Sequence, residues 1–191
     1  MRAGGLAWLF GRWSRPDARN SHVPGRFPRG DCATARCCPS RRCEGPRHLD
    51  DGALAGKPFR LHLAEQLRHG PVVLYFFPKA FTEGCTLETK AFADAMPKFR
   101  AAGARVVGMS ADDLPTLKRF STEACRSKFP VARASPETVK AYDVVLKMKP
   151  ELTDRTSYVI ASDGKIVMVH SDLDWKEHVA MTLAAVQALK R

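Results

Sequence analysis

Two short apolar runs in the middle of the chain limit what it can fold into. Residues 71–77 (PVVLYFF) are a continuous run of apolar, β-branched and aromatic residues, and residues 104–110 (ARVVGMS) are a second, mostly apolar stretch. Such runs are typical of central strands that are buried on both faces of a sheet. Residues 84–101 lie between them and predict a helix, because apolar side chains recur there at helical spacing, at Phe92, Ala95, Met96 and Phe99.

The segments from residue 49 onward continue this alternation of strands and helices. Asp163-Gly164 is a strong hairpin signal between the last two strands. Pro97 should kink the helix over 84–101, because it lacks an N–H and crowds a carbonyl one turn earlier. We therefore predict an α/β chain with a thioredoxin-like fold, a central mixed sheet flanked by helices. The other predicted elements are strands over 57–63, 129–132, 156–161 and 165–170, and helices over 64–67, 112–126, 135–142 and 175–189.

The first 48 residues differ from the rest in composition. They hold ten Arg, three acidic residues and no Lys, so they carry +7 of the net charge of +11. We predict two parts: an Arg-rich, disordered extension over 1–48 and a globular domain over 49–191. Three interpretations of the extension compete: a targeting peptide, a small metal site on Cys32, Cys37, Cys38 and Cys43, and a non-functional extension. The last is favoured, because the cysteine spacing lacks the usual C-x2-C pair.

The globular part contains two cysteines, Cys85 and Cys125. Two cysteines do not build a disulfide-stapled secreted fold, so we predict a reducing compartment and a cytoplasmic location. No apolar run approaches the roughly 18 residues that a membrane span requires. The mild charge of this part predicts no nucleic-acid partner. The six His residues are scattered without metal-ligand spacing, so we expect no cofactor and no metal.

The position of Cys85 in the predicted fold favours a reactive thiol. A single cysteine on an apolar helix face is usually an inert core residue. This one follows a central strand and lies in the first turn of a predicted helix. Ligand sites of open α/β sheets lie at the carboxyl ends of strands, and free N–H groups at a helix start favour a thiolate.

The residues around Cys85 carry a specific resemblance. Pro78, Thr82 and Cys85 form a P-x3-T-x2-C pattern, and FFP followed by GCT-x-E resembles the bacterioferritin comigratory protein (peroxiredoxin Q) branch of the peroxiredoxins. Arg155 begins RTSYVI, which is similar to a second strand motif of that family, and the resemblance covers residues 53–190. It implies a thioredoxin-like fold and a thiol peroxidase that reduces hydrogen peroxide and organic hydroperoxides through a cysteine sulfenic acid.

Each matched residue has a role that the resemblance implies and a plainer alternative. Arg155 would stabilise the thiolate and the peroxide, or it is a surface residue at a strand start. Thr82 would hydrogen-bond the peroxide, or it only caps the helix. Pro78 would shield the sulfur, or it only ends a strand. The backbone N–H groups of Gly84 and Cys85 can cradle a peroxide oxygen.

Recycling of the sulfenic acid requires a second thiol. Many members of the branch place it five residues after the first cysteine, where this chain has Lys90. Cys125 is the candidate that remains. On a helical wheel it lies about 90° from the apolar face, at the margin of the core, although a buried or idle cysteine fits nearly as well. The resemblance implies a thioredoxin- or glutaredoxin-like reductant, and a monomer or homodimer.

Two other function classes compete. A thioredoxin-like oxidoreductase without peroxidase activity is disfavoured, because Thr82 stands where such proteins have the first cysteine of C-x-x-C. A protein that binds nucleic acid or metal through its Arg-rich extension is the other. One departure from the family is visible: Cys43–Asp51 replaces the usual A-P-D-F-like strand. We therefore also expect that an edge strand is missing and that stability is reduced.

Overall fold

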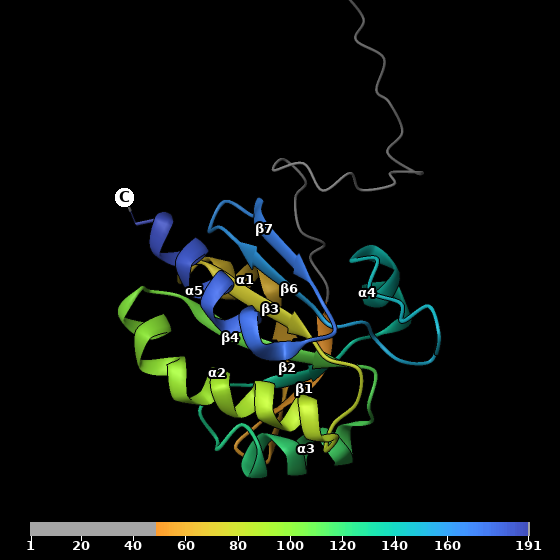
Figure 1. Ribbon diagram of the computed structural model, residues 1–191. Helices are drawn as coiled ribbons and strands as arrows, with labels where there is room; N and C mark the ends of the chain where they lie inside the picture. The colour runs from red at the N-terminus through yellow and green to blue at the C-terminus, as the bar shows by residue number, and fades with distance from the viewer. Residues whose placement is uncertain (1–48, 191) are drawn as a thin grey trace, which may run out of the picture. The chain divides into compact units, whose positions relative to one another are not determined.

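A computed structural model describes residues 49–190, which form a seven-stranded sheet with helices on both faces (Figure 1). The strand order is β2-β1-β5-β4-β3-β6-β7. In chain order the elements are β1 (Leu49–Leu54), β2 (Lys57–His62), α1 (Leu63–Leu67), β3 (Val72–Phe76), α2 (Glu83–Ala101), β4 (Arg105–Ser110), α3 (Leu114–Glu123), β5 (Val131–Arg133), α4 (Pro136–Ala141), β6 (Thr156–Ile160), β7 (Ile166–Ser171), the 3-10 turn η1 (Trp175–Glu177) and α5 (His178–Ala188).

The two apolar runs form the centre of the sheet, as predicted. β3 and β4 pair in parallel, with Val72 opposite Arg105 and Phe76 opposite Met109. β4 and β5 are also parallel, whereas β6 runs antiparallel to β3 and β7 antiparallel to β6. The predicted thioredoxin-like arrangement, a mixed sheet flanked by helices, is confirmed.

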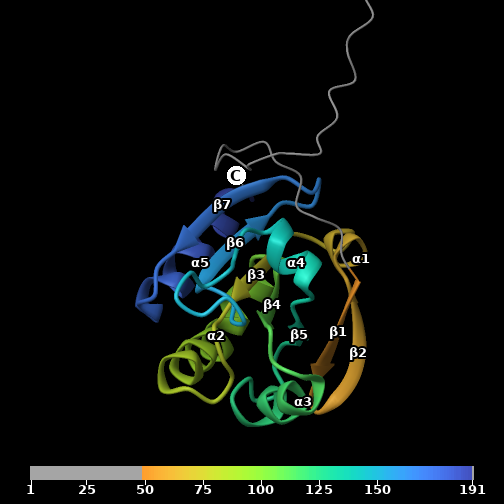
Figure 2. The same cartoon turned by 90° about the vertical axis from the view of Figure 1, so that its right-hand side faces the viewer.

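Alternate side chains of β3 enter two different cores. Val73 and Tyr75 pack against the helices of one face, in a core that also contains residues of α2, α3 and α5. Val72, Leu74 and Phe76 pack on the other face with residues of α1 and with Tyr142 at the end of α4. Figure 2 shows α2 and α5 on the opposite side of β3 and β4 from α4. Every residue of β3 is therefore buried, as its composition predicts.

β1 is the strand that the sequence analysis did not predict. It forms an antiparallel hairpin with β2 at one edge of the sheet and pairs with β5 at Gly52 and Ala53. The expected gap at this edge is therefore filled. The pattern LDDGAL hides the strand because Asp50 is buried: its carboxylate accepts hydrogen bonds from the Ser135 N–H and from the Thr138 hydroxyl.

The helices agree with the prediction except at their ends. α2 continues through Pro97 to Ala101. The last helix begins as a 3-10 turn, and α5 starts only at His178. α3 ends at Glu123, three residues earlier than predicted, because Arg126 and Ser127 have φ angles of 51° and 56°, which an α-helix does not contain. No helix among residues 49–190 is long and apolar enough to cross a membrane.

Candidate active site

Cys85 lies in the first turn of α2, just beyond the carboxyl end of β3. Thr82 precedes the helix in an extended conformation, and its carbonyl accepts the first helical hydrogen bond, from the Thr86 N–H at 2.9 Å. The Cys85 side chain is 1% exposed and packs within the core beneath α2. The Cys85 sulfur is therefore surrounded by apolar side chains, and the backbone N–H groups at the start of α2 are the polar groups beside it.

Arg155 reaches Cys85 from the start of β6, the strand that pairs with β3. It directly precedes β6, and the pairing of Thr156 with Phe76 places it beside the carboxyl end of β3. Its Nη2–H donates to the Cys85 Sγ at 3.4 Å, although the two residues are 70 positions apart. The Arg155 side chain is also buried, at 6% exposure. The structure therefore brings together the two residues that the sequence motifs single out.

Glu88 is the partner of Arg155 that the sequence analysis left without a role. It lies three residues after Cys85 on the same face of α2 and is fully buried. Its Oε2 accepts from the Arg155 Nη1–H in an ion pair. Burial raises the pKa of Glu88 to about 8, against the opposing effect of the Arg155 charge. The spacing from Cys85 was the available signal, because residues three apart share a helix face.

His178 is a second residue that the sequence analysis did not single out. It is fully buried at the start of α5, and its Nδ1 lies 2.8 Å from the Ser157 hydroxyl and 3.8 Å from Glu88 Oε1. Its Nε2 lies 2.9 Å from the Asp172 carbonyl oxygen. Burial lowers the pKa of His178 below its usual range. Since Glu88, Ser157, Asp172 and His178 come from four separate segments, no local pattern could reveal this cluster.

Thr82 and Pro78 frame the loop between β3 and α2. Thr82 stands at the N-cap of α2, but its hydroxyl makes no capping bond and donates instead to the Lys79 carbonyl at 3.0 Å. Its side chain is exposed, whereas Pro78 is half-buried directly after Phe77. The Thr153 hydroxyl donates to the Phe77 carbonyl at 2.7 Å and so ties this loop to the segment that carries Arg155.

Gly84 lies beside the Arg155 guanidinium. A Cβ atom built there would lie 3.4 Å from Nη2 of Arg155 and 3.8 Å from the Trp175 ring, which are ordinary van der Waals contacts. The space at this position therefore accepts a methyl group, and sterics alone do not require glycine immediately before the cysteine.

The predicted position of Cys125 at the margin of the core is wrong. Its side chain is fully buried in the same core as Cys85, and burial raises its pKa well above the usual range. The helical wheel fails because α3 ends two residues earlier, at Glu123. The Cys125 N–H bonds back to the Phe120 carbonyl at 3.1 Å, which turns the side chain inward.

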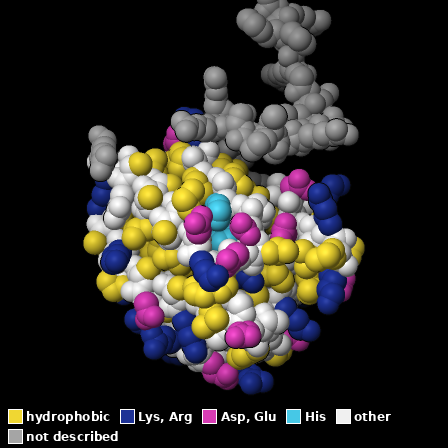
Figure 3. All heavy atoms as spheres, viewed as in Figure 1, with side chains coloured by type: hydrophobic (Ala, Val, Ile, Leu, Met, Phe, Trp, Pro, Cys, Tyr) yellow, Lys and Arg dark blue, Asp and Glu magenta, His cyan; other side chains and the backbone are white. Residues whose placement is uncertain are grey.

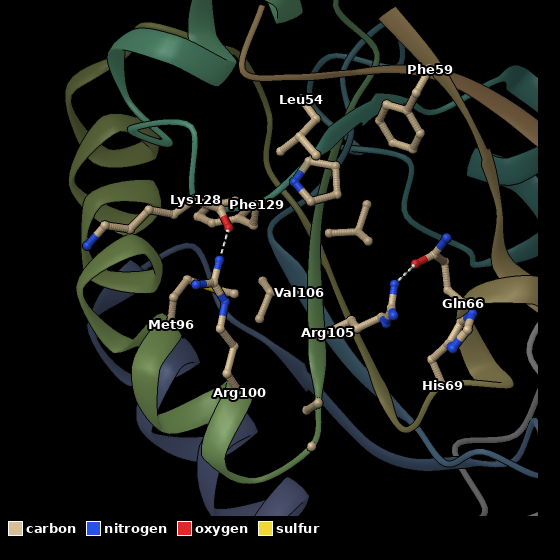
Figure 4. Close-up of a pocket in the computed structure, with 14 residues that line it drawn as sticks. Leu54, Phe59, Gln66, His69, Met96, Arg100, Arg105, Val106, Lys128 and Phe129 are labelled. Atoms are coloured by element: carbon tan, nitrogen blue, oxygen red, sulfur yellow. Dashed lines mark hydrogen bonds between the residues drawn. The ribbon is translucent and has the colours of Figure 1, made fainter. Parts of the chain in front are cut away.

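A cavity of about 510 Å³ lies away from this site (Figure 4). It opens near Arg105, at the amino end of β4, whereas Cys85 follows the carboxyl end of the parallel strand β3. Apolar side chains and three basic ones line it; Figure 4 shows Arg100 bonded to the Lys128 carbonyl and Arg105 bonded to Gln66. The cavity contains none of the residues around Cys85, so it is not part of the thiol site.

Metal ligands are not assembled in the part of the chain that the structure describes. Residues 49–190 contain no group of three or more His, Cys, Asp or Glu side chains that could hold an ion. The cysteine cluster at Cys32, Cys37, Cys38 and Cys43 lies outside the described residues.

Comparisons with known proteins point in one direction. The AhpC/TSA family model matches residues 48–169. The protein named "Peroxiredoxin Q, chloroplastic" of Sedum lineare is 34% identical over 139 residues, which are 71% of this chain and 72% of the relative. The chain spans only 55 or 56% of several other plant proteins of that name.

Solved structures give the same result. The crystal structure of peroxidoxin BcpB from Mycobacterium tuberculosis superposes with a TM-score of 0.66 at 29% identity and covers 80% of this chain and all of that one. Peroxiredoxin Q from Xanthomonas campestris superposes with a TM-score of 0.64 at 26% identity, over 74% of this chain and 91% of that one.

Proposed function

Because the chain belongs to the AhpC/TSA family of peroxiredoxins, we propose that it is a thiol peroxidase whose nucleophile is Cys85. Its substrates are hydrogen peroxide and organic hydroperoxides. The observation that carries the assignment is the contact of the Arg155 guanidinium with the Cys85 sulfur at the start of α2. A fixed positive charge and a helix start at one buried sulfur favour the thiolate and stabilise negative charge that develops beside it.

The reaction is a displacement on oxygen. The Cys85 thiolate attacks one peroxide oxygen, the O–O bond breaks, and the second oxygen departs as hydroxide or alkoxide and takes up a proton. Cysteine is oxidised to sulfenic acid and the peroxide is reduced to water or alcohol. The Arg155 charge and the N–H groups of Gly84 and Cys85 stabilise the departing oxygen. Thr82 hydrogen-bonds the peroxide after its hydroxyl leaves the Lys79 carbonyl, and Pro78 limits water access.

Cys125 is our candidate for the resolving thiol. Its attack on the sulfenic acid would form a Cys85–Cys125 disulfide and release water. Both sulfurs are buried, and disulfide Cα atoms must approach within about 7 Å, so we expect the start of α2 or the end of α3 to unfold locally. A thioredoxin- or glutaredoxin-like protein would then reduce the disulfide. If Cys125 is idle, the same reductant acts on the sulfenic acid directly.

The decisive experiment is mass spectrometry of reduced protein after one equivalent of hydrogen peroxide, with a sulfenic-acid trap present. We expect the adduct on Cys85 in Cys125→Ser, and a Cys85–Cys125 disulfide in the wild type. A Cys85→Ser variant that still consumes peroxide at the wild-type rate would refute the assignment. Insulin reduction without peroxide turnover would instead favour a thioredoxin-like oxidoreductase.

We also propose that the protein acts in the cytoplasm, on the ground of its cysteine content. Several relatives have the word "chloroplastic" in their names, so the location of this protein must be tested directly. On the face shown in Figure 3, acidic and basic side chains are interspersed, which supports a solvated surface and not a nucleic-acid patch. The monomeric or homodimeric state remains a prediction for sedimentation measurements.

A further inference from the structure

The carboxylate of Asp112 contacts the loop that leads to Cys85, which is the β3–α2 loop (residues 77–82). The Ala80 N–H donates to Asp112 Oδ2 at 2.6 Å, across 32 positions of sequence. Asp112 lies in the connection between β4 and α3, which Figure 1 shows running beside the β3–α2 loop. Ala80 is buried and lies five residues before Cys85. A side chain from a separate segment therefore holds the stretch of chain that precedes the nucleophile.

Asp112 is in turn held by Ser110 at the end of β4. The Ser110 hydroxyl donates to the same Oδ2 at 2.7 Å, and the Asp112 N–H donates back to the Ser110 Oγ at 3.3 Å. Ser110 is fully buried, whereas Asp112 is half-buried. Hydrogen bonds to a carboxylate are shorter and about twice as strong as those between neutral groups. The central sheet therefore sets the position of Oδ2, and Oδ2 sets the position of the Ala80 N–H.

The β3–α2 loop has a conformation that it does not favour by itself. Phe81 has a φ of 64°, in the left-handed region that residues with a Cβ atom rarely adopt. Such a conformation persists only where the surrounding structure holds it. Asp112 holds the residue before Phe81, and the Phe81 ring packs edge-on against Phe120 of α3, with the ring centroids 5.2 Å apart. Without the contact from Asp112, the strain at Phe81 favours a shift of the loop.

The position of this loop determines what surrounds the Cys85 sulfur. Thr82 follows Phe81 directly, and its carbonyl accepts the first helical hydrogen bond of α2, from the Thr86 N–H. A shift of the loop therefore moves Thr82 and the first N–H groups of α2 relative to the sulfur. Reaction rates depend steeply on such positions, since a misplacement of about 1 Å can reduce a rate about 10²-fold. The Cys85 side chain is 1% exposed, so a thiol larger than peroxide reaches the sulfur only after a neighbouring segment opens.

We propose that Asp112 is a positioning residue for the peroxidase reaction, and that through the Ala80 N–H it holds the β3–α2 loop closed beside Cys85. The inference rests on the proposed role of Cys85 as nucleophile. With the loop closed, Thr82 and the first turn of α2 are aligned for the attack on peroxide. With the loop open, this alignment is lost but the sulfur is accessible to a thiol reductant. Loss of the Asp112 contact should therefore slow the oxidation of Cys85 and speed the reaction of its sulfenic acid with a thiol.

The test measures these two steps separately, in a Cys125→Ser background that prevents resolution within the chain. Quenched-flow mass spectrometry gives the rate at which hydrogen peroxide oxidises Cys85. The oxidised protein is then mixed with 5-thio-2-nitrobenzoate, whose sulfur attacks the sulfenic sulfur. A mixed disulfide forms, and the hydroxyl group of the sulfenic acid takes up a proton and leaves as water. The loss of the yellow colour of free thionitrobenzoate gives the rate of this second step.

Asp112→Ala removes the acceptor for the Ala80 N–H. We expect oxidation to slow by about 10- to 100-fold, within the range that a misplacement of about 1 Å produces. We expect the reaction with thionitrobenzoate to become about tenfold faster, the factor that corresponds to the loss of one hydrogen bond to a charged group. Asp112→Asn should recover most of both effects, because its amide oxygen can still accept from Ala80. If Asp112→Ala does not fold, Asp112→Ser replaces it, since its side chain is too short to reach Ala80.

Asp113→Ala is the matched control, because Asp113 is the adjacent residue and its carboxylate serves α3 instead. It accepts from the Thr116 N–H at 2.9 Å and caps that helix. Loss of the cap should lower the free energy of unfolding and leave both rates within about twofold. Opposite changes of the two rates in Asp112→Ala alone would support the proposal. Rates that change in the same direction, that stay within about twofold, or that change equally in Asp113→Ala would refute it.

The same experiment separates this inference from the peroxidase assignment. If the Cys125→Ser protein formed no sulfenic acid at Cys85, the assignment itself would fail. If Cys85 were oxidised equally fast with and without the Asp112 carboxylate, only the positioning role would fail. Amide hydrogen exchange needs no peroxide: the amides of residues 80–86 should exchange about tenfold faster in Asp112→Ala, and those of β3 should not change. Unchanged exchange over residues 80–86 would also overturn the proposal.

Discussion

At the scale of single residues, Cys85 and Cys125 differ in their neighbours and not in their burial. Both are buried in the same core. The Arg155 Nη2–H donates to the sulfur of Cys85, whereas burial dominates at Cys125 and raises the pKa of its thiol. Reactive thiols have electropositive surroundings and structural thiols do not. The contact with Arg155 is therefore the feature that separates a nucleophile from a core residue.

Replacing Arg155 by Gln tests this difference. Gln keeps donors but removes the charge, so the second-order rate of peroxide consumption should fall about 100-fold or more, the usual loss for one transition-state donor. The rate is measured by stopped-flow competition with a reference peroxidase. Arg133→Gln is the control, because Arg133 is exposed at the end of β5. A loss of less than about threefold in Arg155→Gln would contradict the role of the guanidinium.

The residue scale also shows where sequence reasoning stopped. Cys85 and Arg155 could be predicted because each lies within a contiguous motif. Glu88 lay inside one of these motifs, but its role depends on an ion pair across 67 positions. His178 could not be predicted, since its partners Glu88, Ser157 and Asp172 meet only after β6 packs beside β3 and α5 packs on α2. Long-range buried polar contacts leave no periodic signal.

At the scale of elements, the end of α3 determines where Cys125 lies, because the cysteine follows the last turn of the helix and is buried there. The helix stops at Glu123, and the left-handed residues Arg126 and Ser127 turn the chain back. The Ser127 N–H bonds to the Ser121 carbonyl at 2.9 Å, and the Lys128 N–H bonds to the Cys125 carbonyl at 3.0 Å. The apolar pattern of the sequence predicted α2, β3 and β4 closely. The turn after α3 depends on positive φ angles at Arg126 and Ser127, and the sequence does not predict such angles because neither residue is glycine.

Ser127→Gly should stabilise this turn. A left-handed conformation costs a residue with a Cβ atom about 1–2 kcal/mol, and glycine avoids that cost while adding about 0.5–1 kcal/mol of chain entropy. We expect the free energy of unfolding in urea to rise by about 0.5–1 kcal/mol. Ser162→Gly is the matched control in the β6–β7 turn, where the serine has no positive φ. Stabilisation by both variants, or by neither, would contradict the strain at Ser127.

At the scale of the whole molecule, we propose that the extension over 1–48 and the domain over 49–191 act separately. The extension holds most of the net charge and four of the six cysteines, whereas Cys85 and Arg155 both belong to the domain. Deleting residues 1–45, which spares β1, should leave the peroxide rate per Cys85 thiol within about twofold, since surface changes away from a site are usually near neutral. Any salt-sensitive binding of nucleic acid should disappear. If the deletion variant lost its peroxidase activity, the extension would be required for that activity and the proposal would be wrong.

Glu88 and His178 also impose opposite pH dependences on the stability of the fold. Glu88 has a pKa raised from 4.5 to about 8, so the folded state binds more protons than the unfolded state, and its contribution is lost as pH rises through 8. His178 has a pKa lowered from 6.5, so its contribution is lost as pH falls below 6.5. Below pH 6.5 the two effects oppose each other, and between pH 6.5 and 8 only Glu88 acts.

The free energy of unfolding should therefore fall by up to about 2 kcal/mol between pH 6.5 and 8, because one proton corresponds to about 1.4 kcal/mol per pH unit. Urea titrations of wild-type protein and Glu88→Gln across this range measure it. The variant should lose the slope above pH 6.5, and below pH 6.5 it should lose stability as His178 takes up a proton without opposition. The exposed Glu65 supplies the control Glu65→Gln, which should follow the wild-type curve. Parallel curves for wild type and Glu88→Gln would mean that Glu88 does not titrate in this range.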